Sequence, residues 1–133
     1  MTAACDTSLL VPTLNPRHPA HAEALEVWPE LTAVPTHVLL ETYSVLTRVQ
    51  LAYQMAGRDV LRALDGLGLE VIGLPESRQA ELVADCAAAD VVGGAVYDGL
   101  VGLTARHHDV TLITRDRRAR ETYAALGVRY RLI

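Results

Sequence analysis

Apolar positions along the chain alternate between two patterns, short continuous runs and longer stretches with helical spacing. The clearest short run is 110–114 (VTLIT), which is typical of a buried strand. In 18–31 the apolar residues recur at helical spacing, although Pro29 is expected to distort or end that helix. Thr36 is predicted to cap the next helix. Strands are predicted over 2–6, 32–35, 69–74, 110–114 and 128–133, and helices over 18–31, 36–52, 58–67, 75–88, 95–107 and 116–126.

Strands separated by helices predict a parallel sheet that is covered by helices on both faces. We therefore expect an α/β fold with a central, mostly parallel sheet of four or five strands. The length of 133 residues suits one domain spanning 1–133, with enough chain to bury a core without disulfides. Sites in such sheets form at the carboxyl ends of strands, so polar residues just after predicted strands are candidates for chemistry.

Four acidic residues stand out because the sequence around them otherwise resembles core. Asp6, Glu41 and Asp98 are each the one charged side chain at neutral pH in a stretch of at least 15 residues. Asp116 closely follows the predicted strand 110–114, and Asp6 ends the first strand. Glu41 and Asp98 are expected within the first turns of helices, where the helix dipole favours negative charge.

Isolated carboxylates in segments of this kind are costly, because ionised groups resist leaving water unless a partner compensates them. The stretches around Asp6, Glu41 and Asp98 contain no arginine or lysine to do so. If the fold gathers these three acids and Asp116, they will repel one another, and a hard divalent cation is the simplest counter-charge. The sequence therefore predicts a Mg²⁺ or Mn²⁺ site formed by the four acids.

Composition narrows the class of protein. Half of the residues are hydrophobic, which argues against disorder. The two cysteines, Cys5 and Cys86, form no C-x-x-C pair, which fits a reducing compartment and argues against a thiolate zinc site. The N-terminus lacks the features of a secretion signal, and no apolar run reaches the roughly 18–20 residues of a membrane span. We therefore expect a cytoplasmic protein without a membrane partner.

The net charge of −4 speaks against a nucleic-acid partner until its distribution is considered. All 12 basic residues are arginine, and the last 28 residues hold seven of them beside three acids, a net +4. Residues 1–105 hold five arginines and thirteen acids, a net −8. An acidic pocket beside an arginine-rich flank suits a phosphodiester, with Arg115 and Arg117 as candidate phosphate contacts. A solvated C-terminal helix with an edge strand is the alternative, which charge alone favours slightly.

The local settings of the four acids resemble the PIN-domain family of metal-dependent nucleases, and specifically the toxin component of VapBC-type bacterial toxin–antitoxin pairs. The matching segments follow in the family's order: 5–10 (CDTSLL), 39–46 (LLETYSVL), 93–100 (GGAVYDGL) and 112–117 (LITRDR). Any one of them is weak, whereas four in order over the chain are fairly specific. Gly99 and Gly102 differ from the alanine-like residues usual there, and Asp109 replaces a frequent glycine, but neither difference removes an acid.

The resemblance implies an endoribonuclease, often directed at structured RNA such as tRNA, that is inhibited by a cognate VapB-type antitoxin and commonly forms a homodimer. Hydrolysis of a phosphodiester needs a nucleophilic water and a stabilised leaving oxygen, and carboxylate-held metal ions provide both. Asp6 and Asp98 are the leading candidates for direct ligands. Asp116 and Glu41 complete the shell, directly or through water, and either one is a candidate base. The resemblance also suggests that the Thr114 hydroxyl binds a water or a carboxylate, although an ordinary strand threonine explains it equally well.

Other interpretations remain open at this stage. Each aspartate, taken singly, is explained by helix capping or by a helix dipole, whereas Glu41 has no obvious capping role. A degenerate PIN-like module that binds RNA or protein without cleavage is a second function. A phosphatase of the haloacid-dehalogenase type is a third, but Ser8 stands where such enzymes have a second aspartate, and the chain has no lysine.

Overall fold

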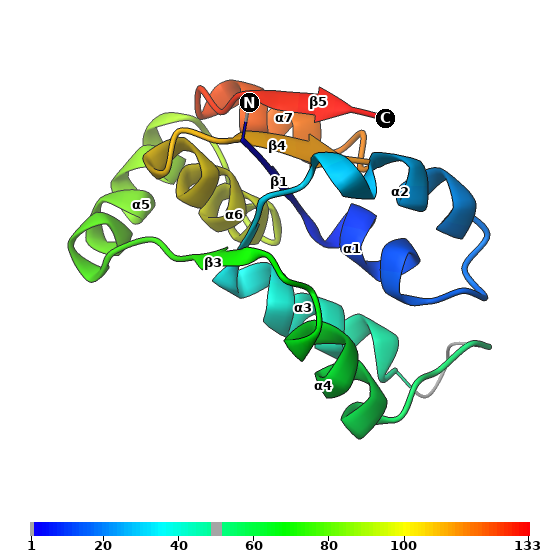
Figure 1. Ribbon diagram of the computed structural model, residues 1–133. Helices are drawn as coiled ribbons and strands as arrows, with labels where there is room; N and C mark the ends of the chain where they lie inside the picture. The colour runs from blue at the N-terminus through cyan, green and yellow to red at the C-terminus, as the bar shows by residue number, and fades with distance from the viewer. Residues whose placement is uncertain (1, 49–51) are drawn as a thin grey trace.

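The computed structural model describes residues 2–48 and 52–133, and these contain a five-stranded sheet with the strand order β3-β2-β1-β4-β5. Every neighbouring pair of strands is parallel. Each strand lies within a predicted one, so the expected α/β fold with a largely parallel sheet is confirmed (Figure 1). The strands are β1 (Ala3–Cys5), β2 (Ala33–Pro35), β3 (Glu70–Ile72), β4 (Thr111–Thr114) and β5 (Tyr130–Leu132).

Helices connect the strands and lie on both sides of the sheet (Figure 1). The predicted helix 18–31 is divided where Pro29 stands, as the missing backbone N–H of proline requires. The longest helices have 13 residues, and none within the described ranges is long and apolar enough to cross a membrane. The helices are α1 (Thr7–Leu14), α2 (His21–Val27), the 3-10 helix η1 (Trp28–Glu30), α3 (Thr36–Leu46), α4 (Gly57–Asp65), α5 (Glu76–Ala88), α6 (Ala95–His107) and α7 (Ala119–Ala125).

The first helix, α1, is absent from the sequence-based prediction because Pro12 lies inside it. Asp6 caps this helix, since its carboxylate accepts a hydrogen bond from the backbone N–H of Ser8. Pro12 has no N–H to offer the carbonyl of Ser8 four residues earlier. The side chain of Arg115 replaces the missing donor, since its Nη1 donates to the Ser8 carbonyl at 3.5 Å.

The ends of α3 also differ from the prediction. Thr36 does not cap this helix but is its first residue, and its hydroxyl donates to the carbonyl of Ile72 in β3 at 3.1 Å. The helix ends at Leu46, whose carbonyl accepts a hydrogen bond from Met55 N at 2.8 Å. The predicted extension to residue 52 is therefore wrong, and its positions 49–51 lie outside the described residues.

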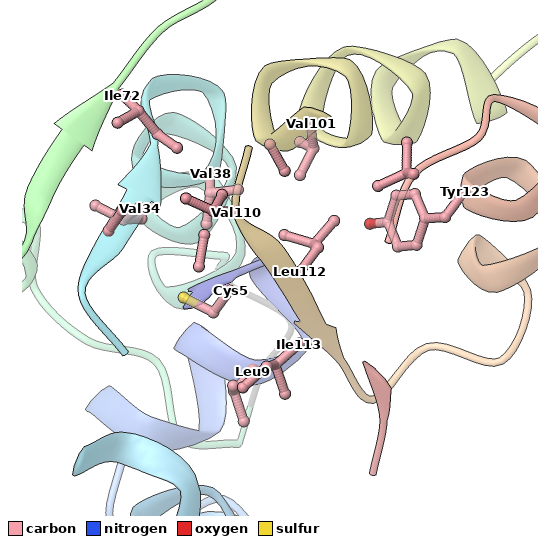
Figure 2. Close-up of a cluster of buried hydrophobic side chains, with 14 of the residues drawn as sticks. Cys5, Leu9, Val34, Val38, Ile72, Val101, Val110, Leu112, Ile113 and Tyr123 are labelled. Carbon is pink, nitrogen blue, oxygen red and sulfur yellow. The ribbon is translucent and has the colours of Figure 1, made fainter. Parts of the chain in front are cut away.

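The core fills both faces of the central strands because successive side chains of a strand point in opposite directions. Leu112 of β4 faces Val101 of α6 and Tyr123 of α7, whereas its neighbour Ile113 lies beside Leu9 of α1 (Figure 2). All five of these side chains are almost completely or completely buried. A smaller cluster of Val11, Leu46 and Val60 joins α1, α3 and α4.

The order of the strands fixes where a site can form. The chain runs outward from β1 through β2 to β3 on one side, and later adds β4 and β5 on the other. The carboxyl ends of β1 and β4 therefore form the point at which the connections diverge, and ligands bind in this crevice in open α/β sheets. Asp6 follows β1 directly, and its backbone N–H donates to the carbonyl of Ile113 in β4.

We expect Leu112→Ala to lower the free energy of unfolding by about 2–5 kcal/mol, because it leaves a cavity between the sheet and two helices. Urea unfolding followed by circular dichroism measures the change. Val83→Ala in α5 is the control, since Val83 is 73% exposed and its truncation is expected to change stability by less than about 0.5 kcal/mol. Equal effects of the two substitutions would contradict this description of the core.

Candidate active site

A pocket of about 340 Å³ lies at the divergence point and is lined by Asp6, Glu41, Asp98 and Asp116. These four acids come from the end of β1, from α3, from α6 and from the segment after β4. The structure thus brings together all the acids that the sequence analysis singled out. Glu41 lies in the second turn of α3 rather than in the first, whereas Asp98 lies in the first turn of α6, as predicted.

Asp6 is the most buried of the four, with 5% of its surface exposed. Burial is the main cause that raises its pKa, while hydrogen bonds from Ser8, Thr114 and Tyr123 act in the opposite direction and stabilise the ionised form. Oδ1 accepts from both the N–H and the hydroxyl of Ser8, at 3.1 and 2.5 Å. Asp6 therefore caps α1 and lines the pocket at the same time.

The hydroxyl of Ser8 links the ends of β1 and β4. Ser8 Oγ donates to Asp6 and accepts from the backbone N–H of Arg115 at 2.8 Å, so the Thr114 hydroxyl, 3.2 Å away, donates either to it or to the Asp6 carboxylate. Thr114 Oγ1 in turn accepts from the backbone N–H of Asp116 at 3.0 Å. A directed chain of hydrogen bonds thus runs from the Asp116 backbone to the Asp6 carboxylate, which fixes the relative positions of two of the acids.

Tyr123 reaches the same carboxylate from α7. Its side chain is completely buried, and its hydroxyl donates to Asp6 Oδ2 at 2.8 Å. Burial, followed by the charge of Asp6, raises the pKa of Tyr123 above its ordinary value, so the phenol keeps its proton and remains a donor.

Asp98 and Glu41 face the pocket from two helices. Burial, followed by the negative charges of Asp116, Asp6 and Glu41, raises the pKa of the half-buried Asp98 to about 6. Glu41 Oε1 lies 3.0 Å from Nε2 of His37, one turn earlier in α3, without the alignment of a hydrogen bond. The effect of these three negative charges on Asp98 shows that the carboxylates lie close enough to repel one another in one pocket.

Asp116 also has two roles. One oxygen, Oδ1, accepts from the backbone N–H groups of Arg118 and Ala119 at 2.9 and 3.4 Å, at the start of α7. Asp116 is not the N-cap of α7, which is Arg118, but it bonds to the N–H groups at the start of this helix and lines the pocket as well. Both roles are compatible because a carboxylate has two oxygens.

The candidate substrate contacts lie at different depths. Thr114 is completely buried behind the pocket, and Arg115 lines it with a side chain that is 25% exposed. Arg115 Nε lies 3.5 Å from Glu23 Oε1, so α2 helps to hold this guanidinium. Arg117 is exposed and is not among the residues that line the pocket.

Three pocket-related residues were not singled out by the sequence analysis. Ser8 has a local signal, since a serine two residues after an aspartate at a helix start often bonds back to it. Tyr123 has no such signal, because it lies 117 residues from Asp6. His18 lines the pocket, and burial and the charge of Arg115 lower its pKa. Its Nδ1 accepts from Ala20 N, which leaves the proton on Nε2 at neutral pH.

The donors of the pocket fit a hard divalent cation, since four carboxylates are gathered where they repel one another. Within residues 2–48 and 52–133, no three acidic, histidine or cysteine side chains are close enough to form a closed cage for a metal ion. This looser arrangement suits Mg²⁺, which binds through one or two carboxylates and keeps several of its waters.

Comparisons with known proteins agree with this picture of the fold. A family model described as the PIN domain matches residues 3–125, a range that contains all four acids. The ribonuclease VapC27 of Mycobacterium tuberculosis is 40% identical over 126 residues, which cover 94% of this chain and 92% of that protein. The ribonuclease VapC40 of the same species is 37% identical over 129 residues, 96% of each chain.

Solved structures share the fold at low sequence identity. The crystal structure of M. tuberculosis VapC20, a Sarcin-Ricin loop cleaving toxin, has a TM-score of 0.72 at 17% identity and covers 95% of each chain. VapBC2 from Rickettsia felis, bound to a DNA fragment from its promoter, has a TM-score of 0.69 at 18% identity, with 100% of this chain and 99% of that chain covered.

Asp98→Asn is expected to stabilise the metal-free protein at about pH 7.5 by about 1–2 kcal/mol, once solvent screening at this half-buried position is taken into account. The pKa of Asp98 in the folded protein lies above that of an unfolded aspartate. Protonation of Asp98 therefore adds its full contribution to the free energy of unfolding below about pH 4, and this contribution is lost as the pH rises through about 6. The advantage of asparagine should therefore vanish near pH 4.

Urea unfolding in the presence of a chelator, at several pH values, measures this difference. Asp65→Asn, at an exposed position at the end of α4, is the matched control and should show no such dependence on pH. An Asp98→Asn variant that is less stable than the parent at neutral pH would contradict the proposed repulsion.

Proposed function

This chain belongs to the PIN-domain family, and from this premise we propose that it is a divalent-metal-dependent endoribonuclease and the toxin component of a VapBC pair. The observation that carries the proposal is the pocket that four carboxylates line, in a chain that matches proteins named as ribonucleases over nearly their whole length. Residues 1–133 would form one PIN-like nuclease domain.

In this proposal Mg²⁺ or Mn²⁺ is held by Asp6 and Asp98 directly, and by Glu41 and Asp116 directly or through water. The bound cation would lower the pKa of the attacking water and stabilise charge on the leaving oxygen. The support for this assignment is the burial of Asp6 together with the raised pKa of Asp98, since both carboxylates gain from a nearby positive charge.

The remaining residues of the pocket would bind and orient the RNA. Arg115 would contact a phosphate next to the scissile bond, because its guanidinium lines the pocket and is held on one side by Glu23. Arg117, which is exposed, would contact a more distant phosphate, and Thr114 would support the site through its bonds to Ser8 and Asp116.

Either Glu41 or Asp116 would accept the proton of the attacking water. Asp116 has one oxygen occupied by backbone N–H groups and a second oxygen available, whereas Glu41 lies beside His37. Both geometries are compatible with a general base, so the two roles stay open.

We also propose a cognate VapB-type antitoxin as the partner and the cytoplasm as the compartment. Two of the solved structures with this fold are VapBC proteins, from R. felis and from nontypeable Haemophilus influenzae. A structured RNA such as tRNA is the proposed substrate.

A homodimer is proposed from the exposed apolar side chains beside the pocket. Leu40 of α3 and Tyr97 of α6 are 69% and 57% exposed, and each directly precedes an acid of the site. The ring of Tyr97 stacks on that of His37, which lies one turn before Leu40 on the same face of α3. A second copy of the chain would cover these side chains.

RNA cleavage is expected to require Mg²⁺ or Mn²⁺, and Asp98→Asn or Asp6→Ala should reduce its rate about 100-fold or more, because each removes a carboxylate that holds the cation. Cleavage of labelled RNA by purified protein measures the rate. Asp65→Asn, which removes an exposed acid outside the pocket, is the matched control and should keep full activity.

Cleavage that persists in Asp98→Asn or under excess chelator would contradict the proposal. Hydrolysis of a small phosphomonoester without an effect on RNA would point to a phosphatase instead. In cells, expression should arrest growth, and co-expression of the proposed cognate antitoxin or Asp6→Ala should relieve the arrest.

Leu40→Asp is expected to weaken self-association at least 10-fold, because a carboxylate buried in an apolar interface lacks a partner. Sedimentation velocity over a range of concentrations measures the dimer. Val83→Asp changes a similarly exposed apolar residue on α5 and serves as the control. A monomer at all working concentrations of the parent protein would contradict the proposed dimer.

A further inference from the structure

The buried hydroxyl of Tyr123 is a polar group in the core whose bonding partner is the carboxylate of Asp6. A phenylalanine would fill the same space among the apolar residues of the core without bringing an oxygen out of water. Burying a hydroxyl is unfavourable unless it is hydrogen-bonded. The packing of α7 therefore does not account for this hydroxyl, whereas the 2.8 Å bond to Asp6 Oδ2 does.

The donors around Asp6 leave little of its carboxylate free. A carboxylate offers about four lone-pair positions, two on each oxygen. The N–H and the hydroxyl of Ser8 occupy those of Oδ1, and the Tyr123 hydroxyl occupies one on Oδ2. The Thr114 hydroxyl is a further donor that lowers the pKa of Asp6, so this carboxylate, which lines the pocket, is held from β4 as well as from α1 and α7.

Gly102 in α6 makes room for the tyrosine ring. A Cβ at this position would lie 2.9 Å from Cδ1 of Tyr123 and 3.0 Å from Cγ2 of Val128. Glycine destabilises the middle of a helix, so helix stability does not explain Gly102. The close approach of Tyr123 from α7 does explain it. Gly102 lies one turn after Asp98, so the same helix presents an acid to the pocket and a gap to Tyr123.

We infer that Tyr123 is a positioning residue: its hydroxyl, placed by the gap at Gly102, fixes the orientation of the Asp6 carboxylate that would hold the cation. This inference rests on the metal site of the proposed function. Partners that orient a ligand in this way change metal affinity or activity by about 10–100-fold when they are removed.

The experiment compares Tyr123→Phe with the parent protein and with Tyr130→Phe. Phenylalanine keeps the ring and removes the hydroxyl. Tyr130 is the matched control, because its ring lies 6.2 Å from that of Tyr123 and it does not line the pocket. Binding of Mn²⁺ to the metal-free proteins is measured from the electron paramagnetic resonance signal of free Mn²⁺, and thermal unfolding of the same metal-free samples reports on folding.

Tyr123→Phe is expected to weaken Mn²⁺ binding about 10–100-fold, whereas Tyr130→Phe should bind like the parent. Gly102→Ala keeps the hydroxyl but forces the ring to move, so it should also weaken binding. In RNA cleavage, Tyr123→Phe should raise the Mg²⁺ concentration for half-maximal rate by a similar factor, while saturating Mg²⁺ restores the rate to within a few-fold of the parent. Unchanged thermal unfolding of metal-free Tyr123→Phe distinguishes this loss of affinity from a defect in folding, because bound metal can also stabilise a weakened fold.

Equal Mn²⁺ affinity of Tyr123→Phe and the parent would overturn the inference and leave the proposed function intact. A rate that saturating Mg²⁺ does not restore would also overturn it. A parent protein that binds no Mn²⁺ would defeat the proposed function, and the inference with it.

Discussion

The burial of a carboxylate at the end of the central strand is the constraint on which the rest of the site depends. Asp6 is removed from water almost completely, which is unfavourable for an ionised group unless donors surround it. Two donors come from Ser8 in the next turn of chain, and a third comes from Tyr123 near the other end of the sequence. The sheet, α1 and α7 must therefore all be in place before this residue is satisfied.

The hydrogen bonds around Asp6 also connect the strands of the sheet to the pocket. The Ser8 hydroxyl ties the end of β1 to the end of β4, because it also accepts from the backbone of Arg115. Thr114 extends this connection to Asp116. The residues that join the ends of these two parallel strands thus also set the spacing of the acids, so helix capping and pocket formation result from one arrangement.

Much of the fold follows from local patterns in the sequence. The alternation of strand and helix, the parallel sheet and the helix Ala95–His107 are all readable from periodicity and from glycine breaks. The helix α1 is not, because Pro12 argues against it locally while Leu9 and Leu10, both fully buried, hold it against the sheet. The end of α3 at Leu46 depends on a bond from Met55, which no local pattern reveals.

For the site, three acids were signalled by their isolation among uncharged neighbours (Asp6, Glu41 and Asp98), and Asp116 by its place just after a predicted strand. The residues that bond to these acids, or that make room for such a residue, cannot be recognised from the sequence in this way. In the sequence, Tyr123 resembles an ordinary core residue and Gly102 resembles a residue that destabilises its helix. The structure explains Gly102, because a Cβ there would clash with the ring of Tyr123. Asp109 is another residue whose role the sequence does not reveal. It adopts a positive φ of 56°, a conformation that favours glycine, and Arg129 donates hydrogen bonds to both its carbonyl and its carboxylate.

The order of the strands has a consequence for synthesis of the chain. β1 is made first, but its neighbour in the middle of the sheet, β4, is among the last segments to leave the ribosome. A nascent chain that ends before residue 111 lacks Asp116, Thr114 and Tyr123, and its first strand has a bare edge. The four acids of the pocket can therefore come together only after nearly the whole polypeptide has emerged, so any activity of this pocket must wait until synthesis is almost complete.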